Sequence, residues 1–325
     1  MKRRARRSSL IVAAIGAAGL SSPLPFANGL ASTRSSAAPT TGTCNAAAFP
    51  GSQPITEHDK SVLRRQTGQT APAEAAVGVP SACSCCHGFP QAFAMDPFPA
   101  NGRRVNSGLV KLSCPHLVRA IDELEDEGGI GMMNDVVKDS EELQRSMVLT
   151  HEMHAKVRRN MLEVLDATMN DDAVDDHTTC SSHEGGAMEN ILRQKLGERG
   201  AEAFLSSGVA GASAGSTDDV KCLHAWLGDY LFRGAQVEED EEEEDKNNFD
   251  ARASMAMGRA VVQALKERGV DISGTEGCRS LCDPSSNAAP LPPKPRNKQR
   301  LKTGKEIARR KRRRKEDEEA QQGEA

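Results

Sequence analysis

Residues 108–124, Gly-Leu-Val-Lys-Leu-Ser-Cys-Pro-His-Leu-Val-Arg-Ala-Ile-Asp-Glu-Leu, predict a short strand that leads directly into a helix. The strand is expected to end at Cys114-Pro115, because proline is tolerated in the first turn of a helix. Past the proline, four apolar residues recur at helical spacing, namely Leu117, Val118, Ile121 and Leu124. Gly128-Gly129 is expected to end the helix. This junction indicates a domain with both strands and helices.

Upstream of this junction, Gln91 to Met95 has the composition of a partner strand. The segment 96–102 separates the two strands, and its Pro, Asn and Gly residues suit a loop between antiparallel neighbours. Ile55 to Gln66 predicts a short helix that Gly68 closes.

Downstream, Ser140 is expected to cap a long helix, since Glu141 and Glu142 follow it near the positive end of the helix dipole. The apolar stripe of this helix comprises Leu143, Met147, Val157, Met161, Val164 and Leu165. His151 and His154 fall along nearly the same face. A last core helix is expected to start with Ser216, Thr217 or Asp218 as its cap and to run to about Phe232, with Val220, Leu223, Leu227 and Leu231 buried.

The fold class that follows is α+β: a mostly helical small domain with a short antiparallel β-hairpin and long disordered termini. Only 38% of the residues are hydrophobic and 3% are aromatic, whereas 27% are charged, so the whole chain cannot form one packed core. We expect residues 1–54 to be a disordered presequence, 55–270 a single domain, and 271–325 a disordered basic tail. Insertions are expected near 170–205, with a helix at about 190–196, and near 235–247.

The first residues have the layout of a signal peptide, with Lys2, Arg3, Arg4, Arg6 and Arg7 before an apolar stretch. The apolar stretch is too short for a comfortable membrane span, so no stable span is expected. Leu30 to Gly51 is rich in Ser, Thr and Ala without an acid, as in an organelle transit segment. This two-part layout resembles the presequences of algae whose plastids have extra membranes, which makes a plastid the expected location, with secretion or the nucleus as alternatives. The terminus could also carry no address at all.

The last third of the chain contains two charged blocks, an acidic run at 238–245 and a basic tail at 294–315. The basic tail can neutralise several phosphates, so a polyanion or a nucleic acid is a candidate partner. The tail has no aromatic residue to stack on bases. A solvated tail, paired with the acidic run, is the equally open alternative.

The candidate chemistry lies in cysteines and histidines. The chain has nine cysteines, an odd number without the regular spacing of a disulfide scaffold. Cys278 and Cys282 could pair with each other in an oxidising compartment. Cysteine and histidine side chains from segments that are far apart in the sequence could together bind one tetrahedral zinc ion. Zinc is therefore the candidate cofactor. The candidate metal ligands are Cys85, Cys86, Cys114, His151, Cys222 and His224.

Each candidate has other interpretations. A histidine on an apolar helical face is often a hydrogen-bonded core residue, and a buried cysteine often behaves as a small hydrophobe. Cys222 could instead act as a nucleophile near a helix N-terminus. The glycine-rich loop 208–215 could let backbone amides approach an anion, although no Gly-Lys-Ser/Thr follows it.

Val220-Lys221-Cys222-Leu223-His224 resembles a bacterial family known only as a domain of unknown function, number five hundred and one. Earlier segments agree in order, namely Cys86-His87-Gly88-Phe89-Pro90, Leu112-Ser113-Cys114-Pro115 and Thr150-His151-Glu152. The likeness covers roughly 56–233, with an insertion between about 170 and 205. A further histidine of the family falls on Asp229 here. The resemblance favours Cys86 or Cys85, together with Cys114, His151, Cys222 and His224. It implies that Cys44, Cys180, Cys278 and Cys282 are local additions.

Three functions remain open at this point, and the sequence does not decide whether the protein is an enzyme. The first is a non-enzymatic module of unknown role with a Cys/His cluster that holds a structural zinc ion. The second is a thiol- or metal-assisted hydrolase that acts on a phosphate-bearing ligand. The third is association with nucleic acid through the basic tail.

Overall fold

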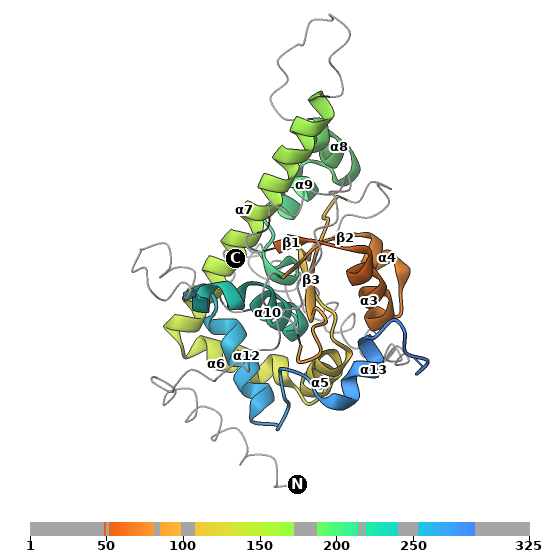
Figure 1. Cartoon of the computed structure of the whole chain (residues 1–325). Coiled ribbons are helices and arrows are strands. Elements are labelled where there is room, and N and C mark those ends of the chain that lie inside the picture. Colours follow the sequence, from red (N-terminus) through yellow and green to blue (C-terminus); the bar gives the residue numbers. More distant parts are fainter. Residues whose placement is uncertain are drawn as a thin grey trace, which may run out of the picture. The chain divides into compact units, whose positions relative to one another are not determined.

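The computed structural model contains a four-stranded antiparallel sheet and a larger set of helices (Figure 1). It describes Phe49, residues 52–80, 85–98, 108–171 and 187–213, Thr217, and residues 219–239 and 253–289. The expected presequence up to residue 48, the acidic run from 240 and the basic tail lie outside the described residues. The α+β class, mostly helical with a small antiparallel sheet, is confirmed.

The sheet has the strand order β1-β2-β3-β4. The strands are β1 Ser52–Pro54, β2 Ala76–Pro80, β3 Ala92–Met95 and β4 Val110–Leu112. The pair β3 and β4 is the predicted hairpin, with Phe93 opposite Lys111. Two further strands extend it, with Gln53 opposite Val79. They were not predicted, because their Ala, Gly, Ser and Pro residues give little strand signal.

The alternation of side chains along β3 places two hydrophobic clusters on opposite faces of the sheet. Ala92 and Ala94 belong to the main core, whereas Phe93 and Met95 belong to a smaller cluster with Leu63. The smaller cluster is covered by α3 Glu57–Thr67 and α4 Thr70–Glu74. Thr56 and Asp59 form a capping box at the start of α3, and Gly68 ends it in the left-handed region, so this predicted helix is confirmed.

The main core lies between the other face of the sheet and five helices. These are α5 Pro115–Asp126, α6 Gly129–Lys138, α7 Glu141–Asp171, α10 Leu223–Glu239 and α12 Ala256–Lys266. The predicted starts of α5 at Pro115 and of α7 behind Ser140 are confirmed, since the Ser140 Oγ accepts the Leu143 N–H. The helix α10 approaches the sheet closely at Gly228, where an added Cβ would lie 3.0 Å from the Leu112 nitrogen.

A third apolar cluster joins the far part of α7 to α8 Ala187–Leu196 and α9 Glu198–Leu205, with the 3-10 turn η1 Val209–Gly211 behind them. The predicted insertion helix is therefore present as α8, and α9 is an addition to it. Phe98 and Phe204 meet edge to face in this cluster, with ring centroids 5.6 Å apart.

One expectation about helix ends is corrected and another is confirmed. The prediction that α10 starts behind 216–218 and ends at about Phe232 is wrong, because the helix runs from Leu223 to Glu239. Gly128-Gly129 does end α5, but a new helix, α6, begins at once at Gly129. Gly128 adopts the left-handed φ of 93° that reverses the chain between the two helices.

The described structure also reaches beyond the expected limits of 55 and 270. Phe49 is 1% exposed and meets Phe232 edge to face. At the other end, residues 271–289, here named the C-terminal strap, contain η2 Glu276–Cys278 and α13 Arg279–Cys282. The helix α13 lies against α3 (Figure 1). Composition alone assigned both segments to the termini.

Candidate functional site

The candidate site forms where the last turn of α5 meets the start of α10. The Glu125 Oε1 accepts the backbone N–H of Leu223 at 2.8 Å. The first amide groups of a helix have no partner within it and carry partial positive charge, so a carboxylate at this position stabilises the helix start. Glu125 therefore fixes the residues around Leu223 against α5.

Three ligand-type side chains converge here. Glu125, Cys222 and His224 each offer one ligand atom, and these atoms all lie within 4.8 Å of one another. The His224 Nδ1 is 3.3 Å from Glu125 Oε1 and 3.9 Å from Cys222 Sγ. All three residues are half-buried, so the group is partly accessible to solvent.

Asp122 faces the other nitrogen of the same imidazole. Its Oδ1 lies 3.7 Å from His224 Nε2. Asp122 and Glu125 are three positions apart on α5, and residues at this spacing share one face of a helix. One face of α5 thus places a carboxylate near each nitrogen of His224.

The charges in the group favour a protonated histidine. Burial lowers the pKa of His224, but the adjacent Cys222 and Glu125 outweigh that effect and raise the pKa to about 10. In the protein without a cation, the imidazolium therefore compensates the Glu125 carboxylate.

The donor set is chemically mixed: one sulfur, one imidazole nitrogen and one carboxylate oxygen. Zinc accepts all three types, and sites with three protein ligands keep a fourth position for water or a substrate. Within the described part of the chain, this is the one group of three Cys, His, Asp or Glu residues packed within that distance.

The two predicted residues Cys222 and His224 are thus brought together, although Cys222 precedes α10 instead of lying in its first turns. His151 is not in this group. Its Nδ1 accepts the Val209 N–H at 3.1 Å, and its ring packs against Trp226 with centroids 5.3 Å apart. It is 1% exposed, and burial together with His154 lowers its pKa to about 4.

His154 is engaged elsewhere in the core. Its Nε2 lies 2.7 Å from Asp229 Oδ1, and Asp229 also accepts from Arg233 Nε at 2.9 Å. Asp229, where the resembling family has a further histidine, thus holds a buried histidine and a buried arginine. Arg233 and His154 outweigh the effect of burial and keep the pKa of Asp229 far below its usual range.

Cys85, Cys86 and Cys114 lie at the opposite end of α5 from Glu125. Cys114 immediately precedes the helix, so its Cα is about 16 Å from that of Glu125 at 1.5 Å of rise per residue. Cys85 and Cys114 are buried, and Cys86 is exposed. The six predicted ligands therefore do not share one centre with Glu125, and the role of these three cysteines as ligands stays a prediction.

The glycine-rich loop uses many of its amides internally. The N–H groups of Gly208, Gly211 and Ala212 donate to carbonyl groups of the loop, and that of Val209 donates to His151. These four amides are therefore not available to a phosphate, and the loop offers less to an anion than its glycine content indicates. Residues 214–216 lie outside the described residues.

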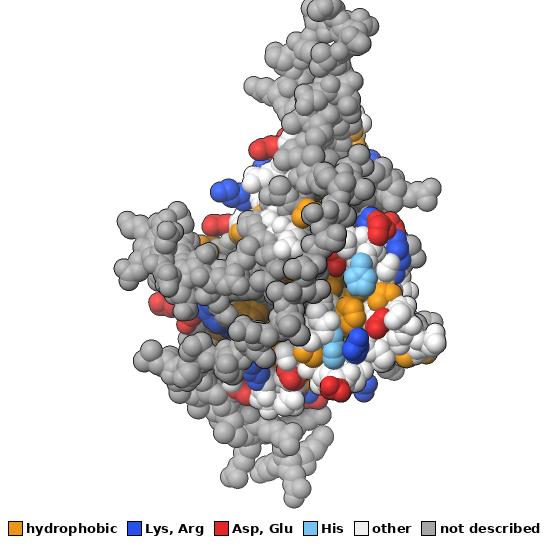
Figure 2. Space-filling model, viewed as in Figure 1, with side chains coloured by type: hydrophobic (Ala, Val, Ile, Leu, Met, Phe, Trp, Pro, Cys, Tyr) orange, Lys and Arg blue, Asp and Glu red, His pale blue; other side chains and the backbone are white. Residues whose placement is uncertain are grey.

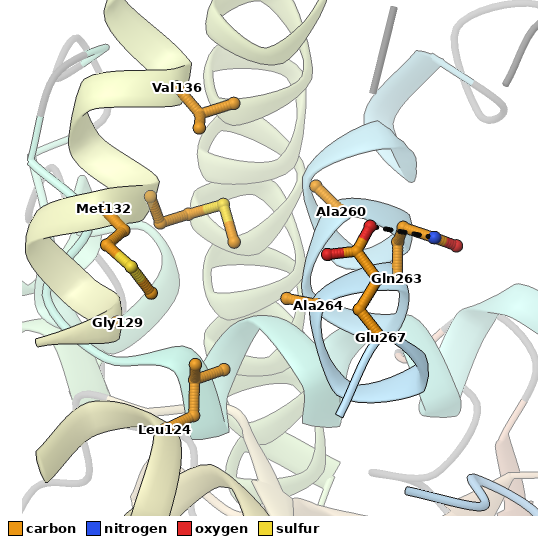
Figure 3. A pocket seen from close by; sticks show the side chains of 9 residues that line it. Leu124, Gly129, Met132, Val136, Ala260, Gln263, Ala264 and Glu267 are labelled. Atoms are coloured by element: carbon orange, nitrogen blue, oxygen red, sulfur yellow. Dashed lines mark hydrogen bonds between the residues drawn. The ribbon is translucent and has the colours of Figure 1, made fainter. Parts of the chain in front are cut away.

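A shallow hollow between α5, α6 and α12 has a different character (Figure 3). Its wall is apolar apart from two residues, since it contains Leu124, Met132, Met133, Val136, Ala260 and Ala264. The Glu267 carboxylate accepts from Gln263 Nε2 at 3.1 Å. This hollow contains no nucleophile and no cluster of metal ligands.

Sequence reasoning missed Glu125 and Asp122. Acidic residues on an exposed helical face are common, and only the contact between α5 and α10 brings these two to Cys222 and His224. On the face shown in Figure 2, acidic and basic side chains of the described residues are interspersed instead of gathered by sign.

The fold and the site define an α+β domain with a Cys/His/Glu group at a helix junction. Residues 81–239 match the model of a family described as protein of unknown function (DUF501), and this match confirms the resemblance seen in the sequence. No curated protein and no solved structure matches the chain significantly. None of the described helices is long and apolar enough to cross a membrane.

Proposed function

We propose that the domain is a divalent-cation-binding module, in which Glu125, Cys222 and His224 hold a zinc-class ion at the junction of α5 and α10. The observation that carries this proposal is the gathering of the three ligand atoms within 4.8 Å. The site differs from the structural zinc site of cysteines and histidines that the sequence indicated, because it has three ligands, one of them a carboxylate, and is half-buried.

The orientation of His224 supports this function. If Nδ1 binds the cation, the neutral ring carries its proton on Nε2, which faces the Asp122 Oδ1 at 3.7 Å. Histidine ligands generally donate their second N–H to a carboxylate or carbonyl, which fixes the ring and strengthens the ligand. Asp122 would therefore act as a positioning residue for His224.

An open fourth position determines what such a site can do. A zinc-class ion there binds a water molecule or an anionic group and can polarise it. The residues of this chain contribute the three ligands and the orienting carboxylate. The fourth ligand would come from the solvent, as water or an anionic group.

Isothermal titration of the metal-free full chain with zinc tests the proposal. Glu125→Gln and His224→Gln should each weaken binding at least about tenfold. Asp122→Asn should weaken it about tenfold, because the His224 ring loses the carboxylate that orients it. The matched control is Glu123→Gln, which alters a 57% exposed carboxylate on the same helix. Unchanged affinity in both Glu125→Gln and His224→Gln, with folding verified by circular dichroism, would refute the proposed site.

A thiol nucleophile is the second candidate, and the 3.9 Å distance between Cys222 Sγ and His224 Nδ1 favours it. Alkylation by iodoacetamide distinguishes a metal-ligand role of Cys222 from a role as a free nucleophile. If the cysteine is a metal ligand, saturating zinc protects Cys222 from alkylation, and the protection disappears in Glu125→Gln. If it is a free nucleophile, zinc has no effect, whereas His224→Gln slows alkylation.

Two further expectations stay predictions, because the residues concerned lie outside the described part. Nucleic-acid association through the basic tail predicts binding that falls steeply with salt concentration and disappears when 294–315 are removed. Plastid targeting predicts that a fluorescent protein fused behind the first 54 residues enters that organelle.

A further inference from the structure

A second group of cysteines lies beneath the C-terminal strap, residues 271–289. The strap crosses the turn that contains Cys85 and Cys86 and the start of α5. The Cys86 N–H donates to Ser273 O at 2.7 Å, and the Gln91 Nε2 donates to Ile272 O at 2.7 Å. His116 Nε2 is within hydrogen-bond distance of Asp271 O at 3.1 Å. These bonds fix the strap to the body of the domain.

The four cysteines at this contact are nearly inaccessible to solvent. The exposed fractions are 5% for Cys85, 1% for Cys114, 3% for Cys278 and 1% for Cys282. Two come from the body and two from the strap. Cys278 and Cys282 are separated by three residues, which falls within the two to four residues common between paired zinc ligands.

The cysteine side chains lie close together. A Cβ built on Gly274 would lie 3.1 Å from Cys278 Sγ, 3.6 Å from Cys85 Cβ and 3.7 Å from the Sγ of the exposed Cys86, so these side chains border the same point. On the other side, the thiols of Cys282 and Cys114 are hydrogen-bonded to each other, and Gln66 Nε2 donates to Cys282 Sγ at 3.3 Å.

The surroundings of the sulfurs contain hydrogen-bond donors that favour thiolates. The backbone N–H groups of Leu117 and His116 donate to the Cys114 sulfur, and those of His87 and Phe89 donate to the Cys85 sulfur. Several buried thiolates repel one another unless a cation compensates them.

We propose that Cys85, Cys114, Cys278 and Cys282 bind a zinc-class cation as a closed four-thiolate site that fastens the C-terminal strap to the domain. The Cys114–Cys282 contact and the common point bordered by Cys85 and Cys278 supply its geometry. Binding releases the remaining thiol protons to solvent and forms four sulfur–metal bonds.

The four sulfurs are less tightly gathered than the ligand atoms of Glu125, Cys222 and His224. Zinc–sulfur bonds of about 2.3 Å require them to draw together around the ion by side-chain rotation. Cys86, which is exposed, is not assigned to the site. The closed set indicates a structural role, in contrast to the open group at the other end of α5.

The test uses the full chain carrying Cys222→Ser, which removes the first metal group, purified with a reductant. Mass spectrometry of the elements should find one equivalent of zinc in this chain. Adding Cys282→Ser or Cys85→Ser should remove it, whereas adding Cys86→Ser, a change at the neighbouring residue, should leave it bound. Loss of the zinc in Cys86→Ser alone, with retention in Cys85→Ser, would overturn the assignment.

Cobalt substitution keeps the proposal testable if a variant does not fold. The Cys222→Ser chain loaded with cobalt should show intense sulfur-to-metal charge-transfer absorption and the visible bands of a tetrahedral ion. Absence of both, or a Cys114–Cys282 disulfide in peptide mapping of the reductant-treated chain, would overturn the proposal. The Glu125 group is tested separately in a Cys282→Ser background, so failure of one site is distinguishable from failure of the other.

Discussion

At the residue scale, His151 makes the stability of the domain depend on pH. Its folded-state pKa of about 4 is below the value of about 6.5 for an unperturbed histidine. A depressed pKa contributes stability above pH 6.5, and this is lost as pH falls toward 4, because the unfolded chain binds the proton first. Between pH 7 and pH 5 the free energy of unfolding should therefore fall by about 2 kcal/mol from this residue.

The variant His151→Asn isolates that effect. The Asn Oδ1 can replace Nδ1 as acceptor for the Val209 N–H, but it does not titrate in this range. Loss of the ring contact with Trp226 lowers stability at every pH, so the slope is the quantity to compare. Urea unfolding at pH 7 and pH 5 should show a smaller difference in the variant. Equal differences in both proteins would exclude His151 as the titrating group.

Asp229 is the second residue whose replacement should be costly. It pairs with Arg233 and His154 in the core, where Arg233 is 8% exposed. Asp229→Asn retains the shape but leaves a buried guanidinium without its counter-charge, which costs about 3–5 kcal/mol. The control Asp135→Asn breaks an exposed pair with Lys138 and should cost less than about 1 kcal/mol. Both values follow from chemical denaturation at pH 7, and similar costs would contradict the role of Asp229.

At the scale of elements, a glycine sets the distance between α10 and α12. A Cβ added at Gly258 would lie 2.4 Å from the Cβ of Tyr230, so the two helices would have to separate. Gly258→Ala should therefore lower the free energy of unfolding by about 1–3 kcal/mol. Gly131 lies in α6, and nothing is within 4 Å of a Cβ added there. Gly131→Ala should raise stability by about 0.5–1 kcal/mol. Thermal denaturation should shift in opposite directions, and a loss in both variants would contradict this account.

The elements that could be predicted are those with local signals. Pro115 at the start of α5, Ser140 before α7 and Gly68 after α3 act on their own neighbours, so the sequence reveals them. The start of α10 could not be predicted in this way, because Glu125 caps Leu223 from another helix. The short strand β2 was missed for a related reason, since its pairing with β1 and β3 stabilises it more than its own composition does.

The same distinction applies to the site. Cys222 and His224 could be selected because they are close in sequence and chemically distinctive. Glu125 could not, since its carboxylate gains significance only from a contact across 98 positions. The spacing of Cys278 and Cys282 indicated a pairing with each other, but both are free cysteines, and the packing of α13 on α3 places Cys282 against Cys114 and Gln66.

At the scale of the whole molecule, the packed structure extends beyond the residues that the family model matches. The match ends at residue 239, whereas α12 and the C-terminal strap continue the packed structure to 289. The helix α12 supplies Met257, Val261 and Leu265 to the main core. The segment matched by the family is thus not the whole cooperative unit of this chain, and residues after it complete the core.

This extension predicts that the strap stabilises the domain, which a comparison of two shortened chains can measure. The chain 1–270 loses the acceptor for the buried Gln91 amide at Ile272 and exposes the surface that covers Cys85 and Cys114. Loss of this buried hydrogen bond alone costs about 0.5–1.5 kcal/mol. With the lost packing, 1–270 should unfold at least about 3 kcal/mol more easily than 1–289 in urea. With Cys222→Ser in both chains, which removes the Glu125 group, a chelator should destabilise 1–289 but not 1–270 if the strap holds its cysteines through a cation. Equal stability of the two chains would show that the strap contributes no folding energy.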